Sequence, residues 1–120
     1  MEINVVKEYT DSPGARYENQ GPFSGERFRD EILYPKFIEA IENGDKVFVN
    51  LDGGYGYGSS FLEETFGGLV RRLKLEKNDN YKKVTQIEII SNDNYVWIEK
   101  IRKYINDAIK NPVKVDKKNE

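Results

Sequence analysis

The sequence has no cysteine and no histidine among its 120 residues. Without cysteine the chain can form no disulfide bond and carry out no thiol chemistry, and this composition is compatible with a reducing compartment. Without histidine it lacks the usual general base near neutral pH and the commonest ligand of transition metals. These absences disfavour most hydrolase mechanisms, and we predict no catalytic residue, no cofactor and no metal site.

The chain also lacks a dominant charge and a long apolar run. Its 19 basic and 21 acidic residues give a formal net charge of −2, so no global positive field would attract nucleic acid. No segment approaches the roughly 20 apolar residues that a membrane-spanning helix needs, and no cationic start leads into an apolar stretch. We therefore expect a cytoplasmic protein without a signal peptide and without a nucleic-acid or membrane partner.

The length is that of one domain. A chain of 120 residues with 38% hydrophobic and 33% charged residues is large enough for a single core flanked by a few helices. We assign residues 1–112 to this domain and residues 113–120, which are mostly charged, to a flexible tail. We find no internal repeat.

The most informative segment extends from residue 47 to residue 70. Residues 47–51 are mostly β-branched or large and apolar, which favours a buried strand. Glycine-rich residues follow, and glycine can take positive φ angles and bring the backbone close to a partner. Ser59 or Ser60 can then cap a helix, and Glu63 stands at the capping-box spacing from Ser60. The segment predicts a strand, a turn and a helix in succession.

The residues after the two serines have the period of an amphipathic helix. Its predicted apolar face comprises Leu62, Thr65, Phe66, Leu69, Val70 and Leu73, and the charged side chains expected to lie mostly away from it are Glu63, Glu64, Arg71 and Arg72. Gly67 and Gly68 interrupt this helix, each at a cost on the order of 1 kcal/mol relative to alanine. They indicate a close approach by another backbone or a partner helix, or else a local bend.

The rest of the chain alternates short apolar stretches with amphipathic ones. We expect short strands at residues 3–6, 16–18 and 84–90. One helix should begin at a Ser24 cap, bend or restart at Pro35 and end at Asn43 and Gly44, and another should span residues 94–110. Because alternating strands and helices require crossover connections, the pattern predicts an α/β domain with a mixed β-sheet of about four strands and about three helices.

The central segment resembles a known family. A strand, a turn, the run Ser59-Ser-Phe-Leu62, an acidic residue and a helix occur in the same order in the STAS domain, the sulfate-transporter and anti-sigma-antagonist domain. The chain is most similar to the small bacterial STAS-like family of unknown function. The resemblance extends from about Gly25 to about Ile109 and is strongest between residues 47 and 70.

The resemblance implies a function as well as a fold. In bacterial anti-sigma-factor antagonists the strand ends in an Asp-Ser-Ser or Asp-Ser-Thr turn, and a switch kinase phosphorylates the serine after the aspartate. Ser59 corresponds to that serine, although Gly58 replaces the aspartate and Phe61 stands where glycine is usual. The resemblance implies a non-enzymatic regulatory module of a bacterial or phage cytoplasm. Its partner would be a protein such as a histidine-kinase-like ATPase with serine kinase activity.

We assign candidate site residues on this basis. Ser59 and Ser60 are the phosphorylation candidates, with helix capping alone as the alternative role. Tyr55 and Tyr57 offer large contact areas at small entropic cost, unless they fold back over the end of the sheet. The predicted partner-binding residues are Gly53, Gly54, Tyr55, Gly56, Tyr57, Gly58, Glu63 and Glu64.

Two other functions remain open at this point. The glycine loop and helix start could hold an anion or a nucleotide phosphate, but no Gly-Lys-Ser/Thr run follows, and Ser59 stands where a dinucleotide fingerprint has its third glycine. Alternatively, the helix face at Gly67 and Gly68 could pair with itself in an assembly. The sequence does not fix the oligomeric state.

The remaining charged residues give weaker signals. The arginines that could form a basic site are Arg16, Arg27, Arg29, Arg71 and Arg72, and we interpret them as a solvated, ion-paired surface because acidic residues outnumber basic ones. The carboxylates of Asp52, Asp93, Glu63 and Glu64 lack the spacing of a calcium loop. Trp97 is expected in the core.

Overall fold

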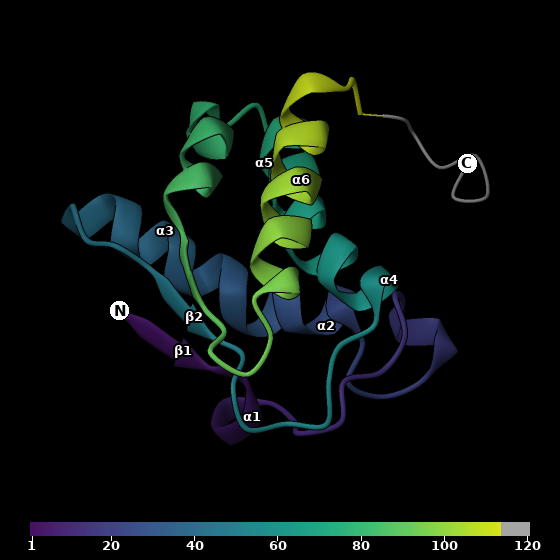
Figure 1. Ribbon diagram of the computed structural model, residues 1–120. Helices are drawn as coiled ribbons and strands as arrows, with labels where there is room; N and C mark the ends of the chain where they lie inside the picture. The colour runs from purple at the N-terminus through teal and green to yellow at the C-terminus, as the bar shows by residue number, and fades with distance from the viewer. Residues whose placement is uncertain (114–120) are drawn as a thin grey trace.

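The computed structural model describes residues 1–113, in which three short strands form a parallel sheet (Figure 1). The strands are β1 (Glu2–Asn4), β2 (Phe48–Asn50) and β3 (Glu88–Ile90), in the order β1-β2-β3. Ile3, Val49 and Ile89 lie opposite one another in the register and are buried together on one face of the sheet. The alternation of buried and more exposed residues along each strand shows that the helices pack mainly against this face.

The α/β class is confirmed, but the sheet is smaller than expected. The described residues contain three strands rather than about four, and all pairings are parallel. Residues 16–18, predicted as a strand, instead lead into a short 3-10 helix, η1 (Glu18–Gln20). The main-chain carbonyl groups of Ala15 and Arg16 accept hydrogen bonds from the start of the next helix, so they are not available to a neighbouring strand.

The first long helical segment joins β1 to β2. It consists of α2 (Gly25–Phe28), a π-helical stretch η2 (Arg29–Leu33) and α3 (Tyr34–Asn43). The Ser24 hydroxyl accepts a hydrogen bond from the Arg27 main-chain N–H at 3.0 Å, which confirms the predicted cap. Pro35 lies in the first turn of α3, directly after the π-helical stretch, and Gly44 ends α3 with φ 66°. The restart and the end of this helix are therefore confirmed.

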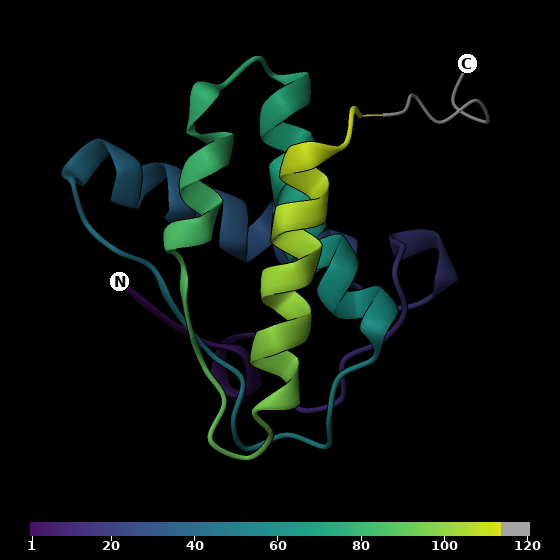
Figure 2. The ribbon, with the colours of Figure 1, turned by 45° about the horizontal axis from the view of Figure 1, so that its top comes forward.

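The second long helical segment follows β2 (Figure 2). It consists of α4 (Ser59–Leu62), a π-helical stretch η3 (Glu63–Gly67) and α5 (Gly68–Leu75). All six residues of its predicted apolar face are buried. The amphipathic pattern thus placed this helix correctly against the core.

The last part of the chain contains less strand than expected. Residues 79–86 form a 3-10 helix, η4 (Asp79–Gln86), so only the end of the predicted strand belongs to β3. The Asn78 side chain caps η4 by accepting a hydrogen bond from the Asn80 main-chain N–H, which favours the helical turn over an extended strand. Then α6 (Val96–Lys110) runs beside α5, as Figures 1 and 2 both show.

The end of α6 is tied to α5 by one lysine. Lys74 Nζ donates hydrogen bonds to the main-chain carbonyls of Ala108, Ile109 and Asn111 at 2.7, 2.7 and 2.9 Å. The predicted tail begins at residue 113, and residues 114–120 lie outside the described part of the chain. No helix in residues 1–113 combines the length and the apolar character needed to cross a membrane.

Candidate functional site

The candidate site lies where the parallel strands end. Asp52 follows β2, and Asn92 and Asp93 follow β3. The Asp52 carboxylate accepts hydrogen bonds from the Asp93 main-chain N–H at 2.9 Å and from Asn92 Nδ2 at 3.0 Å, and Asp93 Oδ2 accepts one from the Gly53 main-chain N–H at 3.0 Å. These bonds hold the two loops together, and the loops lie side by side in Figures 1 and 2.

The glycine-rich loop, residues 53–58, depends on its glycines. Gly53 and Gly56 have φ angles of 99° and 122°, which side chains rarely tolerate. A Cβ atom on Gly54 would lie 3.0 Å from the main-chain oxygen of Asp11, which also accepts a hydrogen bond from the Tyr55 main-chain N–H. The close backbone approach inferred from these glycines is therefore present within the chain itself.

The two tyrosines of the loop have different environments. Tyr55 is 87% exposed, as expected for a contact residue. Tyr57 is half-buried, donates a hydrogen bond from its hydroxyl to the Leu51 carbonyl at 2.9 Å, and packs edge-on against Trp97 with ring centroids 4.9 Å apart. Burial raises the pKa of Tyr57. Tyr57 therefore supports the loop, whereas Tyr55 is presented to solvent.

The serine pair is exposed, but neither serine caps the helix. The N-cap position belongs to Gly58, whose φ and ψ of −77° and 150° are extended, so Ser59 and Ser60 lie inside the first turn of α4. The capping prediction for Ser59, Ser60 and Glu63 is therefore wrong, because the helix begins one residue earlier than a Ser59 cap requires and two residues earlier than a Ser60 cap requires. Within residues 1–113, no group accepts a hydrogen bond from the main-chain N–H of Ser59, Ser60 or Phe61.

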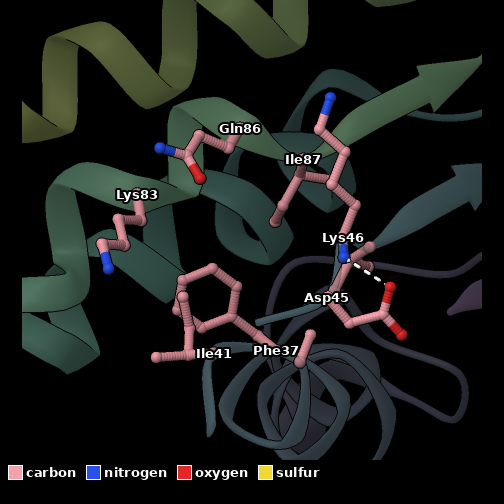
Figure 3. A pocket seen from close by; sticks show the side chains of 9 residues that line it. Phe37, Ile41, Asp45, Lys46, Lys83, Gln86 and Ile87 are labelled. Atoms are coloured by element: carbon pink, nitrogen blue, oxygen red, sulfur yellow. Dashed lines mark hydrogen bonds between the residues drawn. The ribbon is translucent and has the colours of Figure 1, made fainter. Parts of the chain in front are cut away.

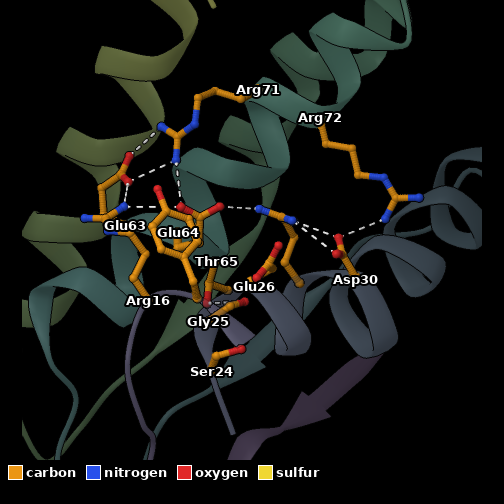
Figure 4. Close-up of polar contacts among 12 residues, drawn as sticks. Arg16, Ser24, Gly25, Glu26, Asp30, Glu63, Glu64, Thr65, Arg71 and Arg72 are labelled. Carbon is orange, nitrogen blue, oxygen red and sulfur yellow. Dashed lines mark hydrogen bonds and ion pairs between the residues drawn. The ribbon is translucent and has the colours of Figure 1, made fainter. Parts of the chain in front are cut away.

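The two glutamates after the serines belong to a charged cluster at the crossing of the two long helical segments (Figure 4). Arg71 donates hydrogen bonds to both oxygens of Glu63 at 2.6 and 3.0 Å, and Arg16 also bonds to Glu63. Glu64 is only 6% exposed and is bonded to Arg29 and, at 3.3 Å, to Arg16. The prediction that Glu64 lies away from the buried face is wrong, because arginines of two other segments cover it.

The cluster also explains the two helical glycines. A Cβ on Gly67 would lie 2.3 Å from Glu63 Oε2, and a Cβ on Gly68 would lie 2.6 Å from Arg29 Nη1 and 2.9 Å from Glu64 Oε2. Both glycines are buried. They make room for charged side chains of the same molecule rather than for another backbone.

The charges of the site are balanced by donors from the chain. Burial alone would raise the pKa of Glu63, but hydrogen bonds from Arg71 and Arg16 outweigh it and lower the pKa below its usual value. The main-chain N–H of Asp93 lowers the pKa of Asp52. In the described part of the chain, no group of three or more metal-ligating side chains could hold a metal ion.

A small pocket lies at the opposite edge of the sheet, where β2 begins (Figure 3). Phe37 and Ile41 of α3 and Ile87 line it, with Lys46 and Lys83 at its rim. Its volume of about 20 Å³ has room for about one water molecule. It is therefore too small for a metabolite. It does not extend to the first turn of α4 at Ser59 and Ser60, which we call the serine turn.

The sequence interpretation missed Tyr95 and Val96. They follow β3 as the glycine loop follows β2, and they are 70% and 50% exposed. The ends of neighbouring parallel strands lie at the same edge of a sheet. Once the pairing of β2 with β3 is known, the loops that follow these strands are therefore expected to lie together. The arginines, by contrast, gave no sequence signal for which carboxylates they would meet.

Comparison with known proteins yields one family. No curated protein and no solved structure matches the chain. Residues 24–97 match the family model described as a STAS-like domain of unknown function, DUF4325, and this stretch includes α2, β2, the serine turn, α5 and β3. With more than half of its length matched, and with the central strand, glycine turn and buried amphipathic helix in place, the chain belongs to this STAS-like family.

Proposed function

We propose that this STAS-like domain is a non-enzymatic regulatory module that binds a protein partner through the serine turn and the glycine-rich loop. The observation that carries the proposal is the exposure of Ser59 and Ser60, whose hydroxyl groups have no hydrogen-bond partner within residues 1–113. Exposed Tyr55 lies four residues before Ser59, and the loop between them rests on Tyr57 and Trp97. Loops held on a rigid scaffold commonly carry binding functions.

Phosphorylation of Ser59 would act on this surface through charge. A phosphoserine adds a charge of roughly −1.5 to −2, which is favourable beside the free N–H groups at the start of a helix. The helical segment from Ser59 to Leu75 is anchored in the core, so the phosphate would alter the surface without disrupting the fold. Resemblance to anti-sigma-factor antagonists supports a serine kinase of the histidine-kinase-like ATPase type as partner, with Mg-ATP bound by that kinase.

The direct test is the intact mass of the native protein purified from its own host, with any phosphate mapped to a residue. We expect one phosphate on Ser59 or Ser60. For the partner that co-purifies, Ser59→Asp should change the affinity, whereas Ser59→Asn, which has a similar size and no charge, should not. An unmodified protein, together with equal affinities for both variants, would contradict the switch.

A second function has one observation in its favour. Three main-chain N–H groups at the start of α4 have no acceptor within residues 1–113, and such groups are the kind that binds a phosphate or another anion. A panel of nucleotides and inorganic phosphate in a thermal-shift assay tests this, because a ligand that binds only the folded state raises the midpoint. No shift at millimolar ligand would reject an anion-binding role.

A further inference from the structure

Three loops meet at the edge of the sheet where the strands end, and together they form one surface. We call residues 10–15, 52–60 and 91–97 the loop edge. Asp11 joins the first loop to the second through Tyr55, and Asp52 and Asp93 join the second to the third by hydrogen bonds of 2.9 and 3.0 Å. Figures 1 and 2 both show the second and third loops side by side, below α4 and α6.

The loop edge gathers exposed apolar side chains. The large hydrophobic residues exposed in the described chain are Phe23, Tyr55, Leu75, Tyr95 and Val96. Tyr55, Tyr95 and Val96, three of these five, belong to the loop edge and are 87%, 70% and 50% exposed. Large aromatic groups on a surface are typical of protein contacts rather than of free solvent-facing loops.

The charge of the loop edge has a single sign. Its three loops contain Asp11, Asp52 and Asp93, and all 19 basic residues of the chain lie outside them. The Asp52 and Asp93 carboxylates accept hydrogen bonds from main-chain N–H groups or from an asparagine, and within residues 1–113 no side-chain cation pairs with them. The surface is therefore both aromatic and anionic, in a chain whose net charge is only −2.

The loop edge is also held in place before any partner binds. Trp97 packs against Tyr57, and a Cβ on Gly56 would lie 3.7 Å from Trp97 Cζ2, so the second and third loops are in contact through this ring. Binding to a surface that is already ordered loses less conformational entropy than binding to a flexible loop. The exposed tyrosines on either side of this contact are thus anchored on a rigid base.

We propose that the loop edge docks a cationic, arginine-bearing segment of a protein partner, an inference that rests on the proposed role as a protein-binding module. An arginine side chain can stack its planar guanidinium on a tyrosine ring and pair with a carboxylate at the same time. Tyr55, Tyr95 and the aspartates supply both kinds of partner. Ser59 belongs to the loop edge, so a phosphate on it would strengthen the attraction for such a segment.

The test uses a fluorescein-labelled nona-arginine peptide as the probe and the full chain, isotope-labelled, in solution. We expect the peptide to shift the amide signals of residues 53–57 and 92–97 and the Trp97 indole signal, with binding that weakens as salt is added. Tyr55→Ser and Tyr95→Ser should each lower the affinity about two- to fivefold. Asp93→Asn, which keeps an acceptor for Gly53, should lower it as well.

Matched controls separate this site from general attraction to an acidic protein. Leu75→Ser removes an apolar side chain that is 64% exposed outside the loop edge, and Glu42→Gln removes an exposed carboxylate on α3. Neither should change the affinity. The inference would be overturned if the control variants lowered the affinity for the peptide as much as the loop-edge variants do. It would also be overturned if the peptide shifted amide signals throughout α3.

Other occupants of the surface give other results. If the loop edge is an interface between two copies, its signals will broaden with protein concentration in the absence of peptide, and Tyr55→Ser will restore them. If it binds a neutral or acidic partner, the peptide will leave the loop-edge signals unchanged. Either result overturns the arginine assignment without touching the phosphorylation of Ser59, which the mass measurement on the native protein decides separately.

Discussion

The two long helical segments begin in similar sequences but in different surroundings. At the start of the first segment, the Ser24 hydroxyl accepts a hydrogen bond from the Arg27 main-chain N–H. The N–H groups of Gly25 and Glu26 donate to the main-chain carbonyls of Ala15 and Arg16, so the first three N–H groups of this helix all have an acceptor. At the second start, Gly58 takes the cap position and has no side chain to accept a hydrogen bond. The first start is part of the folded core, whereas the second presents free donors and two exposed hydroxyl groups.

The difference shows that a serine next to a glycine at a helix start has no fixed role. Ser24 is buried and bonded, and replacing it would remove a structural contact. Ser59 is exposed and has no hydrogen-bond partner for its hydroxyl group in the described part of the chain, so this group could be reached by a kinase or a partner.

The largest effect is expected from the cluster that joins the two segments. Glu64→Gln would remove the buried carboxylate that Arg29 and Arg16 share, leaving Arg29 paired with Asp30 and Arg16 with Glu63. The loss of two hydrogen bonds between charged groups should lower the free energy of unfolding by about 3 kcal/mol. Glu31→Gln, which breaks an exposed pair with Arg27, should cost less than about 1 kcal/mol. Urea unfolding of both variants measures the difference, and equal losses would show that the cluster is not structurally important.

The glycines at the two helix starts should respond differently to alanine. A Cβ on Gly25 would lie 2.5 Å from the main-chain oxygen of Phe61, so Gly25→Ala should lower stability by about 2 kcal/mol or more. A Cβ on Gly58 would meet nothing within 4 Å, so Gly58→Ala should cost no more than about 1 kcal/mol. Thermal unfolding of the Gly25→Ala and Gly58→Ala variants measures this difference in stability. A Gly25 variant as stable as the Gly58 variant would contradict the close packing of the two starts.

Ser24 and Ser59, the serines at the two helix starts, are the next positions to compare. Ser24→Ala removes a cap and should cost about 1 kcal/mol, whereas Ser59→Ala should stay within about 0.5 kcal/mol of the parent protein. Denaturant midpoints with unchanged slopes would measure both. A similar loss at Ser59 would mean that its hydroxyl group caps the helix after all.

The start of α4 has no capping side chain, and a substitution at Gly58 can supply one. Gly58 has the extended backbone of an N-cap residue, so Gly58→Asp should accept a hydrogen bond from the first turn and raise stability by about 0.5 kcal/mol. The variant also restores the Asp-Ser-Ser run seen in anti-sigma-factor antagonists. Gly58→Asn separates capping from charge, since it caps without adding a carboxylate. No gain in thermal midpoint for either variant would indicate that the start of α4 is not limited by its cap.

The smallest expected effect is on the dependence of folding stability on acidic pH. Glu63 has a lowered pKa in the folded state, so its contribution to stability is present above its unfolded value and is lost as the pH falls through the folded value. Glu63→Gln should therefore make stability less sensitive to pH below about 4.3, the ordinary pKa of glutamate. Unfolding curves between neutral and acidic pH measure this. An unchanged slope would show that Arg16 and Arg71 do not hold the charged form.

Local patterns in the sequence predicted much of the fold. The apolar period after residue 61 placed the second helical segment on the core, the Ser24 cap and Gly44 marked the first segment, and the apolar residues 47–51 marked the central strand. Such features depend on neighbours a few residues apart. They predicted the glycine-rich turn between the central strand and the second helical segment for the same reason.

The sequence by itself determined the class of fold and the position of the glycine turn, because these follow from apolar periodicity and local turn chemistry. It indicated the family through its resemblance to the STAS-like domain. Only the tertiary structure decided that Glu64 is buried, that Gly67 and Gly68 make room for charged side chains, and that residues 91–97 lie beside the glycine loop. The hydrogen bonds of Glu64 with Arg29 and Arg16, and of Gly53 with Asp93, join residues 35 to 48 positions apart. The physical reason is that the partner of a buried charge, and the register between strands, are set by the packing of the whole chain and leave no periodic pattern in the sequence.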